Sequence, residues 1–184
     1  MKNWQDDRCE TALLGLGSNI GDRLENLSLA IRFLRKTPGI RLGRVSRVWR
    51  SAPAGYRAQR WFYNAAMRIR TNLSGKSLVS SLKKAERALG RRKRVTNGPR
   101  EIDIDLLLLG RRRIHSISLT VPHPRMHLRR FVLAPASEIA TSMIHPVSGK
   151  SVGALLRGLG KTGSAIALNR QEHLRFRAMN AERN

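Results

Sequence analysis

Two aspartates, Asp103 and Asp105, interrupt an apolar run near the middle of the chain. Residues 102–109 otherwise contain only isoleucine and leucine, a composition typical of a buried strand. Because strand side chains alternate between two faces, both carboxylates point the same way, roughly 7 Å apart along the strand. Unpaired buried charge is too unfavourable to persist, so the pair needs cations. Hard cations with oxygen ligands satisfy this need, and Mg²⁺ carried by a nucleotide is the commonest case.

A half-exposed strand whose aspartates face solvent is the simpler interpretation of a lone Asp-x-Asp pattern, and the pattern by itself favours that interpretation. The surroundings favour a phosphate–metal site instead. Four cations, Arg91 to Arg94, precede the strand, and a Gly98-Pro99 turn leads into it. The whole chain has only 12 acidic residues against 36 lysines and arginines.

The length of 184 residues predicts one domain with a substantial core, expected over 1–160, followed by a basic tail or accessory helix over 161–184. No apolar run approaches the ~20 residues of a membrane span, and the polar first ten residues do not resemble a secretory signal. Cys9 is the only cysteine, so no intrachain disulfide can form and a cytoplasmic location is expected.

The formal net charge of +24 raises the possibility of a nucleic-acid partner. The cations are spread along the whole chain instead of forming one tail or one helix face. A generally basic surface therefore explains the charge as well as any specific polyanion partner does, and composition leaves both explanations open.

Hydrophobic periodicity predicts alternating strands and helices. Strands are expected over Thr11–Leu16, Ile40–Ser51, Trp61–Arg70 and Ile102–Leu109, and helices over Leu24–Leu34 and Ser74–Leu89. The order β-α-β-β-α-β is that of an α+β, ferredoxin-like fold, whose two helices should cover one face of an antiparallel sheet and leave the other for a ligand. We expect residues 114–121 to pair with the Asp-x-Asp strand as a hairpin, followed by extra C-terminal elements with short helices.

Two polar features of these elements allow more than one interpretation. The loop Gly17 to Arg23 could cradle phosphate, but it lacks both the Walker lysine and the Rossmann spacing, so we interpret it as structural first and site-adjacent second. Asn64 lies in a predicted strand, where asparagine is depleted. It is either a satisfied core amide or a residue that reads a ligand.

Three blocks of the sequence together resemble the 6-hydroxymethyl-7,8-dihydropterin pyrophosphokinase family. They are Leu16-Gly17-Ser18-Asn19-Ile20-Gly21-Asp22, Asn97-Gly98-Pro99-Arg100-Glu101-Ile102-Asp103-Ile104-Asp105-Leu106-Leu107, and Val121-Pro122-His123-Pro124-Arg125-Met126 through Leu133. The blocks occur in the family's order, and the resemblance covers about Thr11 to Leu156. It implies transfer of pyrophosphate from ATP to the hydroxymethyl oxygen of the pterin, with release of AMP.

The resemblance also implies a role for particular residues. Asp103 and Asp105 would hold two Mg²⁺ ions, and Arg100 would grip phosphate beside them. On the nucleotide, His123 and Arg129 would contact the triphosphate, and Leu119 and Thr120 would line the adenosine. On the pterin, Asn64 and Phe62 would be joined by Phe131 and by the backbone of Ser51 to Ala54. Arg91 and Arg92, with Arg94 nearby, would belong to a lid that closes over ATP.

The chain departs from the family pattern at two positions, Asn97 in place of a frequent tryptophan and Leu128 in place of a common glutamate. Glu86 matches a family glutamate near the active centre, although a helix-surface acid paired with Arg87 or Lys83 is an equal interpretation.

An RNA-binding module is the main alternative, because ferredoxin-like sheets also bind RNA. That module requires aromatic motifs on its central strands, and the sequence has no such run. A paralogue without catalysis is disfavoured because both aspartates and Arg100 are present. We therefore expect a monomer whose partners are ATP and the pterin, with no membrane and no specific nucleic acid, and with only weak, non-specific polyanion binding.

Overall fold

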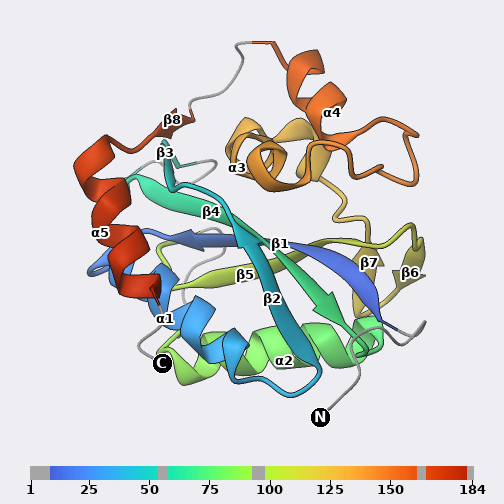
Figure 1. The fold of residues 1–184 in the computed structure, drawn as a ribbon, viewed down its shortest axis with the longest axis horizontal. Helices are drawn as coiled ribbons and strands as arrows, with labels where there is room; N and C mark the ends of the chain where they lie inside the picture. Colours follow the sequence, from blue (N-terminus) through green and yellow to red (C-terminus); the bar gives the residue numbers. More distant parts are fainter. Residues whose placement is uncertain (1–8, 54–57, 93–97, 161–164, 182–184) are drawn as a thin grey trace.

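The computed structural model describes residues 9–53, 58–92, 98–160 and 165–181. Within these residues, a six-stranded sheet is covered by helices on both faces (Figure 1). The strand order is β5-β1-β4-β3-β8, and β2 pairs with the far end of β4. The sheet is antiparallel throughout, as expected for the ferredoxin-like plan.

The centre of the sheet is β1 (Glu10–Ser18), which lies between β4 (Phe62–Thr71) and β5 (Asp103–Leu109). One set of alternating side chains forms the main core with α1 (Arg23–Arg35) and α2 (Gly75–Ala88). This set includes Ala12, Leu14, Leu16, Ala65, Met67, Ile69, Ile104 and Leu106. Because the period is two, the residues between them face the opposite side, where the two aspartates of β5 lie.

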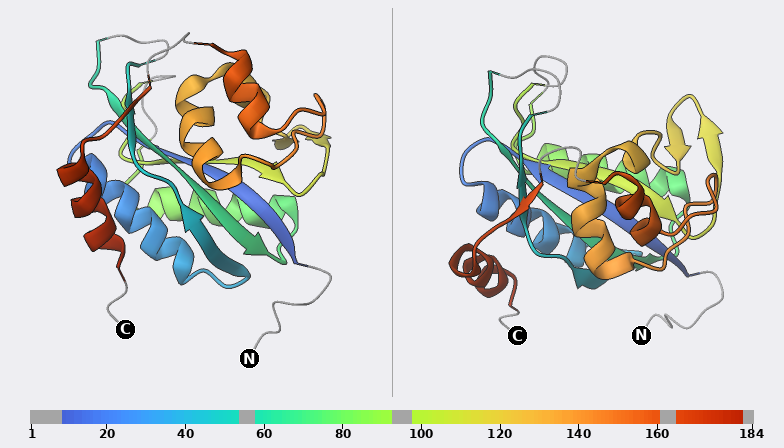
Figure 2. Two further views of the ribbon diagram at one scale, coloured as in Figure 1. Left: turned by 45° about the horizontal axis from the view of Figure 1, so that its top comes forward. Right: turned by 90° about the horizontal axis from the view of Figure 1, so that it is seen from above.

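The opposite face is partly covered, which corrects the expectation of a fully free ligand face. A second core forms there, where α3 (Arg130–Ala140) and α4 (Val152–Gly158) pack over the sheet. Leu13, Ala66, Leu107 and Leu108 from the sheet meet Leu133, Ala136 and Val152 from the helices. The two further views show α3 lying over one half of this face (Figure 2). The ligand space is therefore limited to the uncovered half.

The strand expected over Ile40–Ser51 is two strands, β2 (Ile40–Val45) and β3 (Trp49–Ser51). Both pair with β4 but at different ends. Ser46 causes the break, because its hydroxyl accepts a hydrogen bond from the Ala66 backbone N–H at 2.8 Å, in addition to the backbone bond from Ser46 N to Ala66 O. The periodicity of the sequence carries no signal of such a side-chain contact between strands.

The expected pairing of residues 114–121 with the Asp-x-Asp strand is wrong. Instead, β6 (Ile114–Ser116) and β7 (Leu119–Val121) pair with each other as a separate two-stranded sheet. Ser116 closes the turn, since its hydroxyl accepts from the Leu119 backbone N–H at 3.1 Å. The hairpin packs on α2, where a Cβ added to Gly75 would lie 3.0 Å from atoms of both Ile114 and Leu119. A short 3₁₀ helix, Met126–Leu128, then leads into α3.

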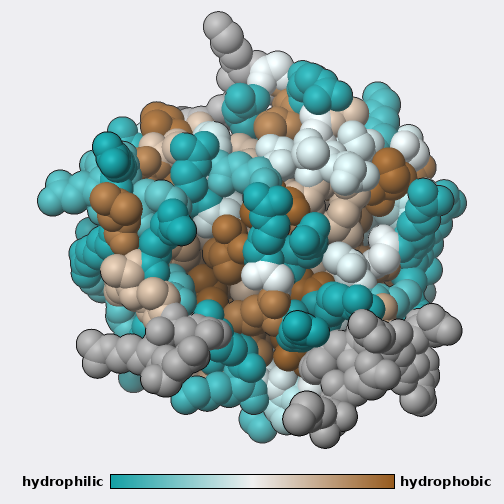
Figure 3. All heavy atoms as spheres, viewed as in Figure 1, coloured by the Kyte–Doolittle hydropathy of each residue, from teal (hydrophilic) through white to brown (hydrophobic). Residues whose placement is uncertain are grey.

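The C-terminal segment forms β8 (Ile166–Ala167) and an accessory helix, α5 (Arg170–Asn180). The helix lies along α1 in the views of Figures 1 and 2, and its Phe176 is 2% exposed within the main core. Hydrophilic side chains cover much of the face drawn in Figure 3, whereas apolar side chains gather near its middle. Among the described residues, no helix has the length and apolar character required to span a membrane.

Candidate active site

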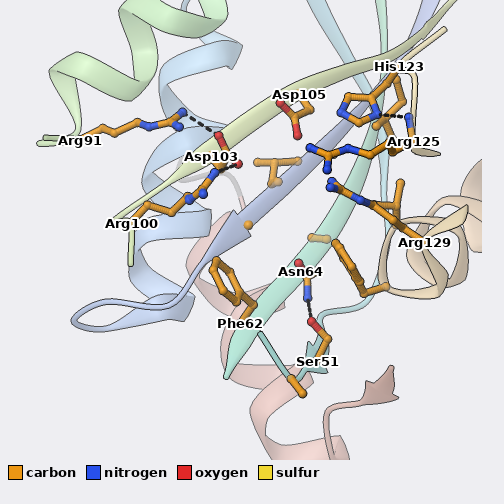
Figure 4. A pocket seen from close by; sticks show the side chains of 18 of the residues that line it. Ser51, Phe62, Asn64, Arg91, Arg100, Asp103, Asp105, His123, Arg125 and Arg129 are labelled. Atoms are coloured by element: carbon orange, nitrogen blue, oxygen red, sulfur yellow. Dashed lines mark hydrogen bonds and ion pairs between the residues drawn. The ribbon is translucent and has the colours of Figure 1, made fainter. Parts of the chain in front are cut away.

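A pocket of about 310 Å³ opens on the uncovered half of the sheet, beside α3 (Figure 4). Its floor is built from β1, β4 and β5, and its walls come from β3, α2, α3 and the segment after β7. The sequence-predicted residues that line it are Ser51, Phe62, Asn64, Arg91, Arg100, Asp103, Asp105, His123, Arg129 and Phe131. Ten predicted residues, distant in sequence, therefore meet in one cavity.

The floor of the pocket depends on two glycines of β1. Gly15 pairs with Asp105, and Gly17 lies between Asp103 and Asn64 in neighbouring strands. A Cβ at Gly17 would lie 3.5 Å from Oδ1 of Asn64, and any longer side chain would fill the cavity. The loop from Gly17 was predicted to be structural first and site-adjacent second, and the need for a bare backbone at Gly17 arises from the strands beside it.

Asp103 is neutralised by two arginines. Its carboxylate forms ion pairs with Arg91 at 2.6 Å and with Arg100 on its other oxygen. Burial by itself raises the pKa of Asp103, but Arg100 and Arg91, with Lys83 behind them, outweigh burial and hold that pKa below the ordinary value. This carboxylate therefore stays ionised in the ligand-free pocket.

Asp105 is in the opposite electrostatic situation. It points into the pocket (Figure 4), and its carboxylate has no hydrogen bond or ion pair within the described part of the chain. Burial, followed by the negative charges of Asp103 and Glu86, raises the pKa of Asp105 to about 6. An added cation in front of this carboxylate would relieve both effects.

Glu86 lies beneath the two aspartates and is 2% exposed. Its carboxylate accepts a hydrogen bond from the Ile104 backbone N–H at 2.7 Å and pairs with Lys83 at 2.7 Å and with Arg91. The surface interpretation of Glu86 is therefore wrong, although its expected pairing with Lys83 is present. Lys83 itself lines the pocket and was missed, because a lysine on a helix gives no signal of what it faces.

Asn19 holds the backbone that carries Arg100. The two residues exchange hydrogen bonds, from Asn19 N to Arg100 O at 3.1 Å and from Arg100 N to Oδ1 of Asn19 at 2.8 Å. The side-chain amide also donates to Gln59 at 2.9 Å and to the Arg60 backbone oxygen at 3.2 Å. The loop after β1 is thus site-adjacent, since it fixes the segments that lead into β4 and β5.

Asn64 forms the other end of the pocket, together with two aromatic rings. It is 7% exposed, and its amide nitrogen donates to the Ser51 hydroxyl at 3.0 Å. Its oxygen has no hydrogen bond within the described residues and faces the cavity (Figure 4), which Phe62 and Phe131 also line. Asn64 is therefore anchored as a core amide on one side and free to accept a hydrogen bond from a ligand on the other.

A cluster of cationic and imidazole groups lines the wall opposite β4. Arg129 and His123 were predicted to lie in the site. Arg125 also lines the pocket, but no role was predicted for it within the third block. Burial lowers the pKa of His123, and the charges of Arg129 and Arg125 lower it further. His123 Nδ1 accepts a hydrogen bond from the Arg125 backbone N–H at 3.2 Å, which leaves the proton of the neutral ring on Nε2.

Some predicted residues lie elsewhere. Leu119 is 8% exposed in the main core, and neither it nor Thr120 lines the pocket. Arg92 is exposed and also lies outside the lining. Ala54, Arg94 and Asn97 fall outside the described residues. The exposed side chain of Leu128, one of the two departures, is likewise not part of the pocket wall.

The described residues contain no group of three or more histidine, cysteine, aspartate or glutamate side chains placed to hold a metal ion by themselves. Asp103 and Asp105 supply only two carboxylates, which suits a cation that brings other oxygen ligands with it, such as Mg²⁺ on a nucleotide. The unpaired carboxylate of Asp105 fits such an ion.

Comparison with known proteins gives one consistent family. The family model for 7,8-dihydro-6-hydroxymethylpterin-pyrophosphokinase (HPPK) matches residues 13–141. A 2-amino-4-hydroxy-6-hydroxymethyldihydropteridine pyrophosphokinase of Bacillus subtilis is 42% identical over 128 residues, covering 70% of this chain and 77% of its own length. The folic acid synthesis protein fol1 of Pneumocystis carinii is 38% identical over 143 residues, which is 78% of this chain but only 19% of that protein.

Among solved structures, wild-type Plasmodium falciparum HPPK-DHPS with STZ-DHP is similar in fold, with a TM-score of 0.66 at 14% sequence identity. The match covers 82% of this chain and 43% of the Plasmodium chain. This chain thus spans less than half of the length of that protein and about a fifth of fol1, while it spans most of the Bacillus enzyme.

The two aspartates should respond to pH with opposite signs in the absence of divalent metal. Asp105 has a folded-state pKa of about 6, above its ordinary value of 3.8, so its favourable contribution is lost as pH rises through 6. Asp105→Asn should therefore stabilise the protein relative to wild type by on the order of 1–3 kcal/mol at about pH 8, and much less at about pH 4.

Asp103→Asn is the matched control on the same strand face. The pKa of Asp103 is lowered, so its contribution is present at neutral pH and is lost on acidification. This variant should destabilise the protein at neutral pH. Denaturant unfolding in EDTA across this pH range measures both, and two shifts of the same sign would contradict the assignment of charges in the pocket.

Proposed function

Because the chain belongs to the 7,8-dihydro-6-hydroxymethylpterin-pyrophosphokinase family, we propose that it is an ATP-dependent pyrophosphokinase of folate biosynthesis. It transfers pyrophosphate from ATP to the hydroxymethyl oxygen of 6-hydroxymethyl-7,8-dihydropterin and releases AMP. The observation that carries this proposal is one pocket with Asn64 and Phe62 at one end and two carboxylates at the other, with cationic side chains on both sides of the carboxylates.

The pterin occupies the end formed by Asn64, Phe62 and Phe131. The free oxygen of Asn64 accepts from a donor on the heterocycle edge, and the bond to Ser51 holds the amide plane in place. The aromatic rings pack against the flat heterocycle. An amide fixed in this way discriminates against rings that lack the matching donor, which apolar packing cannot do.

The triphosphate occupies the end formed by Arg100, Arg125 and Arg129. Attack on the β-phosphorus spreads charge over all three phosphates, and fixed cations aimed at that charge lower the barrier. His123 adds a neutral N–H donor from Nε2 without a further full charge. Asp103 and Asp105 would hold two Mg²⁺ ions carried with ATP, which supply charge neutralisation at the transferred group when bound.

Arg91 has two acidic partners, Asp103 and Glu86. If Asp103 held a metal ion, Arg91 would keep its ion pair with Glu86 and would be released to turn toward phosphate. Glu86 is not left unpaired by this change, because Lys83 and the Ile104 N–H also contact it. The exchange therefore avoids an uncompensated buried charge, which would cost several kcal/mol.

The proposal extends to the location and assembly of the protein. A monomer in the cytoplasm is our proposal, and the single cysteine in the sequence supports a reducing compartment. The charge of +24 supports weak, salt-sensitive adhesion to polyanions beside the enzymatic function.

Loss of either strand aspartate should nearly abolish turnover. Asp103→Ala and Asp105→Ala each remove one of the two carboxylates in the pocket, and we expect at least a ~100-fold lower rate of pterin pyrophosphorylation. Circular dichroism should show that both variants remain folded. If either variant kept a rate within about twofold of wild type, the assignment of metal ligands would be wrong.

Asn64→Ala should weaken pterin binding far more than ATP binding. Removing a buried hydrogen-bonding group costs on the order of 1–3 kcal/mol, which corresponds to roughly 5- to 150-fold in the pterin Kd. Titration calorimetry with a pterin analogue and with Mg·ATP separates the two effects. Equal losses for both ligands would make Asn64 a structural amide only.

Arg91 and its neighbour Arg92 form a matched pair that separates catalysis from polyanion binding. Arg91 lines the pocket, so Arg91→Ala should lower kcat/KM at least about tenfold with a modest change in ATP affinity. Arg92 is exposed outside the pocket, so Arg92→Ala should leave kcat/KM within about threefold.

A salt titration of RNA binding by the same two variants supplies the control. If this loop bound nucleic acid, each variant would reduce the salt dependence of RNA affinity by about one counterion and leave turnover unchanged. That combination of results would overturn the catalytic assignment of Arg91.

A further inference from the structure

The C-terminal segment, residues 165–181, lies beyond the region 13–141 that the family model matches, yet it contacts the strands that form the pterin end of the pocket. Its strand β8 pairs with β3, with Trp49 opposite Ala167 and Arg50 opposite Ile166. Next to this pair, the Leu168 backbone N–H donates to the Val48 oxygen at 3.0 Å. The segment therefore continues the sheet at its β3 side.

Strand β3 is only three residues long, and it ends at Ser51, the residue that anchors the amide of Asn64. On its other side β3 pairs with β4. Without β8, it would be the edge of the sheet in the described structure. Short edge strands with few backbone hydrogen bonds open at low free energy, so β8 limits the motion of Ser51.

The first half of α5 contacts β4 directly. Glu172 accepts a hydrogen bond from the Tyr63 hydroxyl at 2.9 Å, and Tyr63 lies between Phe62 and Asn64 in the chain. Burial, reinforced by this hydrogen bond, raises the pKa of Tyr63, so the phenol stays protonated and donates. On the same ring, the guanidinium of Arg23 lies 3.8 Å from the centroid.

The polar contacts at the end of α5 are with α1, outside the pocket lining. Asn180 donates to the Ser28 hydroxyl at 3.1 Å, and Arg32 donates to the Met179 backbone oxygen at 3.0 Å. None of these four residues lines the pocket. One helix thus makes a side-chain hydrogen bond near the pocket, through Glu172, and another away from the pocket, through Asn180.

We propose that residues 165–181 act as a clamp that positions β3 and the beginning of β4 for pterin binding. The inference rests on the proposed function. In the clamped protein Ser51, Phe62 and Asn64 are ordered before the pterin arrives. Without the clamp, the pterin must order them, and its apparent affinity falls. The triphosphate end is formed by β5 and the segments around α3, so ATP affinity should not change.

Tyr63 and Glu172 are positioning residues in this proposal, and substitution of either one removes a partner of the hydrogen bond between them. Tyr63→Phe removes only the hydroxyl, and Glu172→Ala removes only its partner. Both should raise the pterin KM about three- to tenfold, the effect of one net hydrogen bond, while kcat and the Mg·ATP Kd stay within about twofold. Glu172→Gln should restore the KM, because its amide oxygen still accepts from the phenol.

Asn180→Ala is the matched control at the other end of the same helix, where it removes the bond to Ser28 and a second bond to the Phe176 backbone oxygen within α5. It should lower the melting temperature by a similar amount and leave the pterin KM unchanged. Equal KM effects at both ends of α5 would overturn the clamp, as would an unchanged KM in Tyr63→Phe. If Glu172→Ala does not fold, Tyr63→Phe and Glu172→Gln still decide the question.

Hydrogen exchange of the β3 amides gives a readout that does not depend on turnover. Exchange at Arg50 and Ser51 should accelerate at least about threefold in Tyr63→Phe and stay at the wild-type rate in Asn180→Ala. Unchanged exchange in Tyr63→Phe would overturn the clamp even if the enzyme is active. Failure of the proposed function is distinguishable, because the wild-type protein itself would then show no pyrophosphate transfer.

Discussion

Two carboxylates on one buried strand face require compensating positive charge, and most of the pocket is arranged around this requirement. Asp103 satisfies it within the protein, through Arg91 and Arg100. Asp105 does not, and its pKa of about 6 is the consequence. An apolar residue at this position would give a more stable protein, because burial without a partner penalises the ionised carboxylate. Under the proposed function, a bound cation would remove this penalty, so the burial that lowers stability would also raise the affinity for a nucleotide-borne ion.

The uneven cover of the sheet divides the pocket into its two chemical ends. α3 packs over one half of the face and carries Phe131, while the segment that leads into it carries Arg129, so one short stretch of chain contributes to both ends. The floor between the ends is bare because Gly15 and Gly17 have no side chains there. Under the proposed function, a flat heterocycle and a phosphate would approach along the same strands, which would bring the reacting oxygen close to the phosphorus.

Patterns within one stretch of sequence correctly predicted features that depend only on that stretch. The alternation of residues 102–109 placed both aspartates on one face. Asp22 directly precedes α1 and caps it, accepting hydrogen bonds from Leu24 N and Glu25 N at 3.1 Å each. The errors concern partners that are distant in sequence. The break at Ser46 depends on Ala66, and the β6–β7 hairpin depends on its packing against α2. The pocket role of Lys83 depends on β5, where the lysine approaches the Ile104 backbone oxygen at 3.5 Å. Periodicity encodes which face a residue occupies but not which segment covers that face.

The net charge of the pocket accounts for only a small part of the net charge of the chain. Five cationic side chains (Lys83, Arg91, Arg100, Arg125 and Arg129) and two carboxylates line it, a difference of three positive charges, whereas the whole chain carries +24. Within the pocket, like charges already repel, since burial and then Arg125 lower the pKa of Arg129. Under the proposed function, a triphosphate would relieve this repulsion at the same place where metal ions would relieve Asp105. Binding of both would then remove two opposite electrostatic penalties, which neither a cation nor an anion alone could do.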